Sequence, residues 1–230
     1  MGMGEHGRFG DGAWTRAWAG LAVVALLVGC VSTEDLAKRE READGYYKQG
    51  LSHLASNQQQ AFVSFQKSIQ VNPDNYDAHY ALGSIHFQRK EFADAEREFR
   101  RCISLRPDDG ESLNFYGRTL IELQRLPEAV DVLRKTTALP LYATPDKAYS
   151  SLGHALSLMG DNAGAIRAYQ EALKIDPPTV PRALLHLELG RLYIVQGEPI
   201  KARESLAQAK SLDPQGTAGA EATKLMQRLK

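Results

Sequence analysis

The side chains that could do chemistry are scattered along the chain. His79 and His86 lie seven residues apart, so on one helix they would share a face and could in principle hold a metal ion. His53, His154 and His186 are single residues on other expected helices or turns. The sequence has no glycine-rich phosphate loop and no paired-cysteine metal spacing. We therefore predict no catalytic centre, metal site or cofactor, and expect His79 and His86 to be core or groove histidines.

A short apolar segment, residues 17–29, comes directly before Cys30. It is shorter than the about 20 apolar residues that a membrane-spanning helix needs. Arg8 and Arg16 precede it, and basic residues followed by an apolar run are typical of a secretory signal. We therefore predict that residues 1–29 are a signal peptide.

The residues next to Cys30 make this prediction more specific. Leu27-Val28-Gly29-Cys30 resembles a bacterial lipobox, with a branched residue first and a small residue before the cysteine. The resemblance implies cleavage before Cys30 and a diacylglyceryl group on its sulfur, and two or more acyl chains anchor a protein stably. The alternatives are an incidental cysteine after a cleaved signal, or an uncleaved membrane anchor. Val31 stands where enteric lipoproteins retained at the inner membrane have Asp, which favours the periplasmic face of the outer membrane.

The overall composition excludes several kinds of partner. Lys plus Arg and Asp plus Glu number 28 each, so nothing favours nucleic acid or an acidic membrane surface. The hydrophobic fraction of 43% and the charged fraction of 24% are ordinary for a globular protein. Two cysteines exclude a disulfide framework, and we expect Cys102 to be a small buried thiol.

Most of the chain consists of an internal repeat. A glycine recurs at spacings of 33, 34, 36 and 37 residues, followed each time by an alanine, a large apolar residue and a proline. The glycines are Gly50, Gly83, Gly117, Gly153 and Gly190, and the alanines are Ala61, Ala95, Ala129, Ala165 and Ala202. Small residues let two helices approach closely, and proline cannot continue a helix interior. The pattern resembles the tetratricopeptide repeat, a helix-turn-helix unit of about 34 residues.

The repeat predicts an all-α fold, a right-handed α-solenoid of about five tetratricopeptide units. We place the units at 43–75, 76–109, 110–145, 146–182 and 183–216. Residues 30–42 would form a tether and leading helix, helical from about Glu34. Residues 217–230 have apolar side chains at helical spacing, which predicts a capping helix. Because almost every residue serves the solenoid, we do not expect an enzyme.

The first helix of each unit is expected to line the concave side of the solenoid. The outward positions form an aromatic and aliphatic cluster in the first two units and a polar region around Arg118. The predicted protein-binding residues are Tyr47, Leu51, Leu54, Tyr80, Ser84, Phe87, Asn114, Arg118 and Ile121. Exposed apolar patches usually mark interaction sites, so we expect a protein segment to dock there, with an acidic group on Arg118. Alternatively, the helix from Glu34 covers the cluster, or the phase is wrong by one residue.

One stretch, residues 113–156, is more specific than the general repeat. Leu113-Asn114-Phe115-Tyr116-Gly117 leads to the loop at Pro140 to Pro145. This stretch is similar to the type IV pilus biogenesis lipoproteins of the PilF/PilW/Tgl type, often called pilotins. The lipobox and the array of units also fit that family. Phe115 and Ser151 are departures, because the family commonly has Asn at both positions.

The resemblance implies a non-enzymatic scaffold that is lipid-anchored to the outer membrane through Cys30. Its partner would be the type IV pilus secretin subunit, which it would help to reach the membrane and to multimerise. No nucleic acid and no small-molecule substrate are expected. The alternative is a tetratricopeptide lipoprotein adaptor of another envelope assembly system, such as the outer-membrane β-barrel assembly machine.

Overall fold

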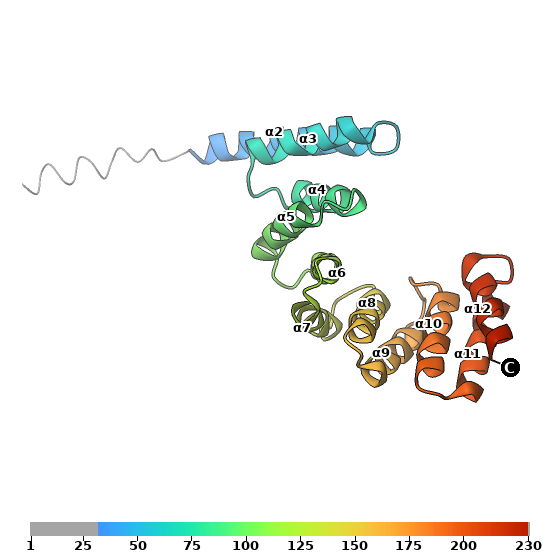
Figure 1. Cartoon of the computed structure of the whole chain (residues 1–230). Coiled ribbons are helices and arrows are strands. Elements are labelled where there is room, and N and C mark those ends of the chain that lie inside the picture. The colour runs from blue at the N-terminus through green and yellow to red at the C-terminus, as the bar shows by residue number, and fades with distance from the viewer. Residues whose placement is uncertain (1–31, 230) are drawn as a thin grey trace, which may run out of the picture.

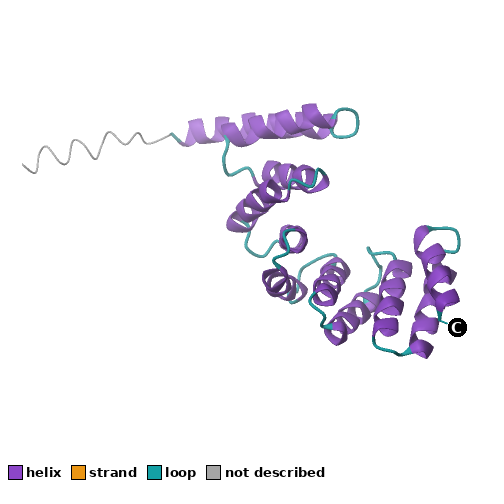
Figure 2. Ribbon diagram, viewed as in Figure 1, coloured by secondary structure: helices purple, strands orange, loops and turns teal. Residues whose placement is uncertain are grey.

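The computed structural model describes residues 32–229, and this range folds into helices joined by turns and short loops (Figures 1 and 2). No strand occurs within it, so the predicted all-α fold is confirmed. The predicted signal peptide and Cys30 lie outside the described residues. The helices are α2 (Thr33–His53), α3 (Gln58–Val71), α4 (Tyr76–Gln88), α5 (Phe92–Leu105), α6 (Gly110–Glu122), α7 (Leu126–Thr137), α8 (Pro145–Leu158), α9 (Asn162–Lys174), α10 (Arg182–Val195), α11 (Pro199–Leu212) and α12 (Thr217–Arg228).

Consecutive helices pack as hairpins, and the hairpins follow one another along an arc (Figure 1). Helices α4, α6, α8 and α10 lie on the inner side of the arc, while α5, α7 and α9 lie on its outer side. Each hairpin packs mainly on its neighbours along the chain, as α5 on α6 and α7 on α8. This arrangement is the predicted helical solenoid, in which the first helix of a unit faces the hollow.

Side-chain caps and prolines set the helix starts. The carboxylate of Asp109 accepts a hydrogen bond from the backbone nitrogen of Ser112 at 2.7 Å and so caps α6. Pro145 opens α8, where its missing N–H costs nothing. The residue before it, Thr144, donates its hydroxyl to Glu111 Oε1 at 2.8 Å instead of capping α8. This bond ties the loop before α8 to the start of α6.

The turn inside four of the units contains a residue in the left-handed conformation. Lys90, Gln124, Gly160 and Gly197 have φ values of 61°, 59°, 82° and 72° and stand at equivalent places, just after the first helix of each unit. Glycine adopts this conformation without steric cost, whereas a residue with a Cβ does not. The fourth and fifth units, which have Gly160 and Gly197 at this turn, therefore adopt the left-handed conformation with less steric cost.

In each unit a large side chain of the second helix packs directly on the recurring glycine of the first helix. A Cβ at Gly117 would lie 2.6 Å from Leu133 Cγ, and one at Gly83 would lie 2.9 Å from the Phe99 ring. The alanines of the repeat are completely buried beside them, as Ala129 illustrates. The predicted close approach of the two helices in a unit is therefore present. Its direct cause is a large side chain lying on the glycine.

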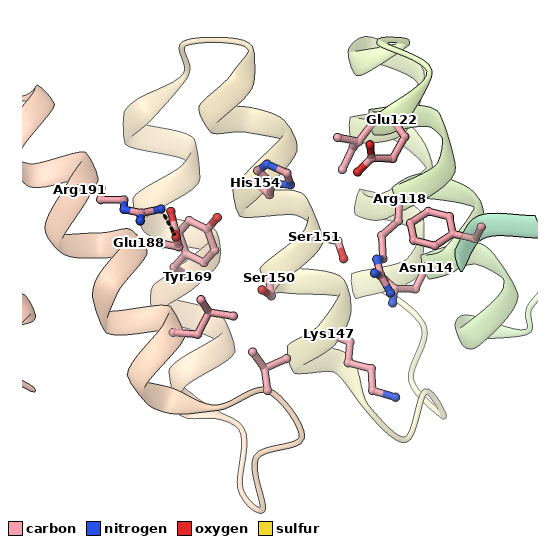
Figure 3. A pocket seen from close by; sticks show the side chains of 14 residues that line it. Asn114, Arg118, Glu122, Lys147, Ser150, Ser151, His154, Tyr169, Glu188 and Arg191 are labelled. Atoms are coloured by element: carbon pink, nitrogen blue, oxygen red, sulfur yellow. Dashed lines mark hydrogen bonds and ion pairs between the residues drawn. The ribbon is translucent and has the colours of Figure 1, made fainter. Parts of the chain in front are cut away.

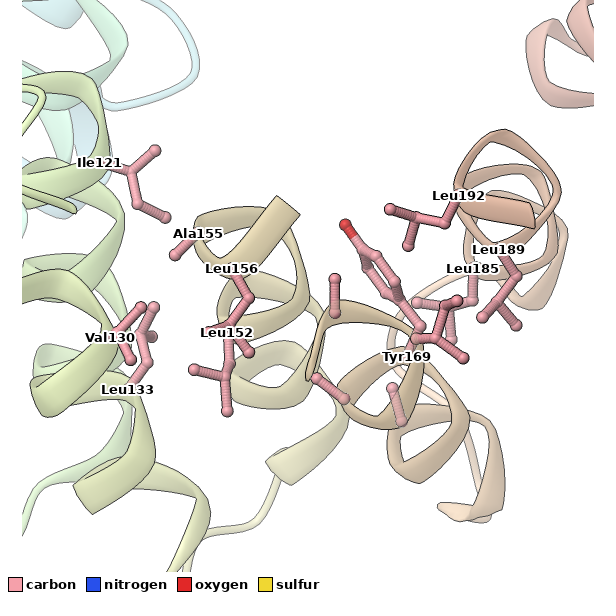
Figure 4. Packing of buried hydrophobic residues seen from close by; sticks show 14 of the residues in the cluster. Ile121, Val130, Leu133, Leu152, Ala155, Leu156, Tyr169, Leu185, Leu189 and Leu192 are labelled. Atoms are coloured by element: carbon pink, nitrogen blue, oxygen red, sulfur yellow. The ribbon is translucent and has the colours of Figure 1, made fainter. Parts of the chain in front are cut away.

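The largest apolar core runs through the third, fourth and fifth units (Figure 4). Leu133, Leu156 and Tyr169 belong to it and are at most 5% exposed. A smaller cluster holds the first two units together around Phe65. Between these two clusters the rings of Phe99 and Phe115 stack with their centroids 5.4 Å apart.

Helix α2 is longer than its unit. Its 21 residues run from Thr33 to His53 without a break, so the tether expected at residues 30–42 is helical from Thr33 and continuous with the first repeat helix. The helix lies along α3 and does not fold back over the arc (Figure 1). Within residues 32–229, no helix combines the length and apolar character that crossing a membrane requires.

The last helix, α12, closes the end of the array. It packs on α10 and α11, and its apolar side chains join a small core with Leu187, Leu206 and Ala209. Ala218 and Ala222 are the buried residues of that face. The structure thus has a capping helix where the apolar spacing at the end of the chain predicted one.

Candidate protein-binding groove

A groove of about 560 Å³ lies on the inner side of the arc (Figure 3). Helix α6 forms one wall, α8 forms the floor, and α10 with the loop before it forms the other wall. The side chains that line it include Asn114, Arg118, Ile121, Lys147, Ser150, His154, Tyr169, Val180, Leu184, Glu188 and Arg191. Polar, charged and apolar groups are mixed, so the groove has the character of a recognition surface.

Four of the nine predicted binding residues line this groove: Phe87, Asn114, Arg118 and Ile121. Ser84 lines a second hollow beside it, together with Phe87 and Arg118. Whether any of them binds a partner stays a prediction. Their position on the inner side of the arc agrees with the phase chosen from the sequence.

The apolar residues predicted to cluster in the first two units differ in their exposure. Leu51 and Leu54 are exposed at 44% and 41%. The Tyr47 ring turns inward instead, with its centroid 5.7 Å from that of Phe65. Tyr47 is therefore half-buried against the core of its own unit, while Leu51 and Leu54 remain exposed, and whether they form one binding surface stays a prediction.

Tyr80 is the second aromatic residue that packs inward. Its ring meets Phe99 and Phe115 edge to face, at centroid distances of 6.0 and 5.7 Å. Burial raises the pKa of the Tyr80 hydroxyl to about 12, and the charges of Glu111 and Asp109 act in the same direction. Tyr80 is thus a packing residue between units, and Phe87 is the aromatic residue of the set that reaches the groove.

Arg118 is the most distinctive side chain of the groove. Its guanidinium lies 4.9 Å from the ring centroid of Phe87 and 5.0 Å from that of Phe115. Burial lowers its pKa, an effect that the charges of Glu122 and Glu111 oppose. Among residues 32–229, no carboxylate comes within the 4.0 Å of an ion pair, although Glu122 lies one turn further along α6. A guanidinium on aromatic faces without an acidic partner is prepared to accept one.

The other cations of the groove already have partners. Lys147 Nζ lies 2.8 Å from Glu111 Oε1, and Arg191 Nη1 lies 2.9 Å from Glu188 Oε1. Figure 3 shows the Arg191–Glu188 pair on the wall opposite Arg118. Arg118 is therefore the one lysine or arginine lining the groove, within the described part of the chain, that lacks an acidic partner.

Asn114 lies one turn before Arg118 on α6 and beside it in the groove (Figure 3). Its side chain is 1% exposed, and its Oδ1 has no hydrogen-bond partner among the described residues. Leaving a buried polar group unpaired costs about 1–3 kcal/mol. Asn114 is therefore a buried polar residue on the groove wall whose oxygen the described residues leave unsatisfied.

The wall opposite Arg118 depends on a buried carboxylate. Asp146, in the first turn of α8, accepts hydrogen bonds from the backbone nitrogens of Thr179 at 2.6 Å and Val180 at 2.7 Å. It also accepts the Thr179 hydroxyl at 2.7 Å. Burial raises the pKa of Asp146, but these hydrogen bonds lower it by more. The pKa of the carboxyl is therefore below its usual value. The loop before α10 is thereby held with Val180 and Leu184 facing the groove.

Sequence reasoning missed Val180 and Asp146 as parts of the site. The available signal was the extra length between the fourth and fifth units, "PPTVPRA", which lengthens the connection between their helices. An insertion in a repeat array often carries a binding face. Nothing in the sequence connects that insertion to an acid 33 residues earlier.

The two histidines considered for metal binding are buried and separately engaged. His79 Nδ1 lies 2.7 Å from Glu98 Oε2, and its Nε2 lies 2.9 Å from the Pro73 carbonyl oxygen. His86 Nδ1 lies 2.6 Å from Glu91 Oε2, beside Asp94. Because the two rings have different partners, they do not converge on one ion. That the protein binds no metal stays a prediction.

The repeats and the groove define the architecture of a tetratricopeptide-repeat solenoid. Models of the family described as "Tetratricopeptide repeat" match residues 76–109 and 146–177. The chain is also similar to the type IV pilus assembly protein PilF of Pseudomonas aeruginosa strain PAO1, with 28% identity over 187 residues, which are 77% of this chain and 72% of PilF. The predicted resemblance to this group is confirmed.

Solved structures agree with the fold. The structure of Pseudomonas aeruginosa PilF aligns with a TM-score of 0.65 and 23% identity, over 84% of this chain and 93% of that one. The structure of PilW, described as a widely conserved type IV pilus biogenesis factor, aligns with a TM-score of 0.69 and 21% identity, over 81% and 92% of the two chains. At these identities the structures establish the helical solenoid.

Proposed function

We propose that this chain is a non-enzymatic scaffold of type IV pilus biogenesis. It binds the secretin subunit and promotes the localisation and multimerisation of the secretin at the outer membrane. The observation that carries the proposal is the similarity to PilF along 77% of the chain. A short shared motif would mean little in a repeat protein, whereas similarity of this extent spans several units of the array.

The inner side of the arc supports a binding role. The groove contains an arginine and a buried amide oxygen that have no acidic or hydrogen-bonding partner, respectively, among residues 32–229, and apolar side chains lie on the opposite wall. These groups recognise a polypeptide through hydrogen bonds, charge and apolar contact. The proposed action requires no covalent step.

The membrane anchor is the second part of the proposal. A lipid on Cys30 would hold the scaffold on the periplasmic face of the outer membrane. Confining the scaffold and the secretin subunit to one membrane raises the effective concentration at which they meet, without any additional contact. The groove then has to discriminate between partners more than it has to bind tightly.

A deletion strain tests the function. We expect fewer detergent-resistant secretin multimers and fewer pili, restored by a plasmid copy of the gene. The levels of unrelated outer-membrane β-barrel proteins are measured in the same strain and should not change. Normal secretin multimers together with normal piliation would remove the pilus proposal. If depletion of β-barrel proteins accompanied those normal multimers, the adaptor of the β-barrel assembly machine would be the better description.

The anchor is tested separately with Cys30→Ala. We expect the variant to be absent from the outer-membrane fraction and not to incorporate a radiolabelled fatty acid. The wild-type chain should be present in that fraction and should incorporate the label. Retention of the variant in the outer membrane would contradict the lipid anchor. It would leave the binding role intact, because the groove is formed by residues between 87 and 191.

A further inference from the structure

We infer that His79 is held as an imidazolium between Glu98 and the carbonyl oxygen of Pro73. In this form it clamps the junction of the first two units, and the clamp opens as the pH rises above neutral. Pro73 belongs to the loop between α3 and α4, and Glu98 belongs to α5, so one side chain of α4 holds both elements. The inference concerns this junction alone and does not depend on the proposed function.

The positive charge is argued from the two ring nitrogens of His79. Its Nδ1 lies 2.7 Å from Glu98 Oε2, and its Nε2 lies 2.9 Å from the Pro73 carbonyl oxygen. A carbonyl oxygen and an ionised carboxylate can only accept hydrogen bonds. A neutral imidazole carries one N–H and the imidazolium carries two, so only the charged ring donates to both acceptors.

The ionised state of Glu98 is argued from its second contact. Arg97 Nε donates a hydrogen bond to Glu98 Oε1 at 3.2 Å. The hydrogen bond and charge of His79, together with Arg97, hold the pKa of Glu98 below its usual value, although burial opposes them. A protonated Glu98 facing a neutral ring would give up the attraction to Arg97. The proton shared by the pair therefore belongs on the imidazole.

The third unit has two apolar residues where the second unit has this ion pair. Counted from the recurring glycine, Leu113 corresponds to His79 and Val132 corresponds to Glu98. Both members of the ion pair are buried, and burying two charges costs free energy that apolar residues do not lose. The repeat therefore packs without charges at this place. What the pair adds to packing is a dependence on one proton.

The surroundings of His79 leave this ring as the group that responds near neutral pH. The hollow beside the ring is lined by Ile69 of α3 and by three arginines and Glu98 of α5. Each arginine has an acidic partner: Arg97 pairs with Asp94, Arg100 with Glu96, and Arg101 with Asp74. Cys102, on the same helix, stays a neutral thiol because burial raises its pKa to about 12. Carboxylates ionise well below neutral pH, and arginines stay charged well above it.

Loss of the second proton weakens the clamp. A neutral His79 turns a ring lone pair toward Glu98 or toward Pro73, so that two acceptors face each other and one bond is lost. Stability falls with rising pH wherever the native state binds more protons than the unfolded state. Because an imidazole in an unfolded chain loses its proton at about pH 6.5, the clamp contributes fully below that pH and is lost as the pH rises further.

Urea denaturation at several pH values tests the linkage on the full-length chain, purified in detergent. We expect the equilibrium constant for unfolding to rise about tenfold between about pH 6 and about pH 8.5, the effect of one proton held more tightly by the native state. The double variant His79→Leu with Glu98→Val copies the residue pair of the third unit and should have a flatter profile over this range. The matched control is His154→Gln, which removes an exposed histidine and should keep the wild-type profile.

Nitrogen NMR of isotope-labelled histidine measures the charge of the ring directly. At about pH 7.5, roughly one unit above the usual value for imidazole, we expect a proton on both ring nitrogens of His79. The double variant identifies the signals of His79 by their absence. His86 is the internal comparison, because its Nδ1 lies 2.6 Å from Glu91 Oε2 and a neutral ring satisfies this one acceptor.

Three results would overturn the inference. They are wild-type stability that does not fall over the stated range, an unchanged profile in the folded double variant, and a neutral His79 ring at slightly alkaline pH. Circular dichroism checks that each variant is folded. If the double variant does not fold, the charge of His79 in the wild-type chain, assigned through its backbone signals, still decides the question. None of these measurements involves a secretin, so they stand or fall separately from the proposed function.

Discussion

The carboxylate of Asp146 lies 2.7 Å from the backbone nitrogen of Val180, and this contact joins the start of α8 to the wall of the groove. The same carboxylate holds the backbone and hydroxyl of Thr179. A carboxylate that receives three hydrogen bonds in a buried position defines the path of the loop before α10. The shape of the groove therefore depends on a residue that does not line it.

Asp146→Asn should loosen this wall. The amide keeps the shape of the side chain but loses the charge that strengthens its bonds, so we expect a loss of about 1.5–3 kcal/mol in the free energy of unfolding. Urea denaturation measures the loss, and hydrogen exchange should show faster exchange at Thr179 and Val180. The control is Asp161→Asn at the N-cap of α9, where Asn serves as well as Asp. Equal stability of the two variants would show that the loop needs no charged anchor.

Asn114→Leu separates a binding role from a structural one. Replacing an unpaired buried amide by an apolar side chain of similar volume should leave stability unchanged or raise it, because no bond is lost. Binding of a secretin-derived peptide should weaken, because the variant replaces a polar side chain that lines the groove by an apolar one. Thermal unfolding and fluorescence anisotropy give the two readouts. A clear drop in stability together with unchanged affinity would make Asn114 a structural residue.

Gly117→Ala tests the packing contact between this glycine and the Leu133 side chain. The new methyl group would lie 2.6 Å from Leu133 Cγ, so we expect a loss of about 1–3 kcal/mol in unfolding free energy from overpacking. Gly45→Ala is the matched control, because nothing lies within 4 Å of a Cβ at that position of α2. It should stabilise the helix by about 0.5–1 kcal/mol. Similar effects at both sites, measured by urea denaturation, would exclude the packing explanation.

Because of Glu98, the free energy of unfolding should depend on pH in the acidic range. Burial raises its pKa, but the hydrogen bond and charge of His79, together with Arg97, lower it more, so the folded-state pKa lies below the unfolded value. The stabilisation is then fully present above the unfolded pKa of about 4.3 and is lost as the pH falls through the folded pKa. Glu98→Gln should flatten the stability profile in this acidic range. An exposed-site variant, Glu204→Gln, should follow the wild-type profile.

The thiol of Cys102 should be inert in the folded chain. The residue is fully buried, and burial raises its pKa to about 12, with the charges of Asp109 and Glu98 acting in the same direction. The thiolate is the reactive form, so a thiol reagent at neutral pH should react only after unfolding. The measurement uses Cys30→Ala, in which Cys102 is the sole cysteine. Rapid reaction of the native chain would mean that α5 opens far more often than its packing indicates.

The sequence by itself determined the fold and the inner face of the array. Gly83 and Ala95 recur in phase because every unit repeats the same helix contact, and such contacts lie within about 34 residues along the chain. The same phase placed Asn114 and Arg118 on the inner side, where the groove is found. Local periodicity therefore suffices to predict which helix face a residue occupies.

Only the tertiary structure decided which of those inner residues remain available to a partner. Tyr47 and Tyr80 occupy the same repeat position as Asn114, yet their rings pack on other rings, Phe65 in one case and Phe99 with Phe115 in the other. The unpaired state of Arg118 depends on where every neighbouring acid lies. Those positions arise from contacts between units, and the repeat pattern does not contain them because it describes each unit alone.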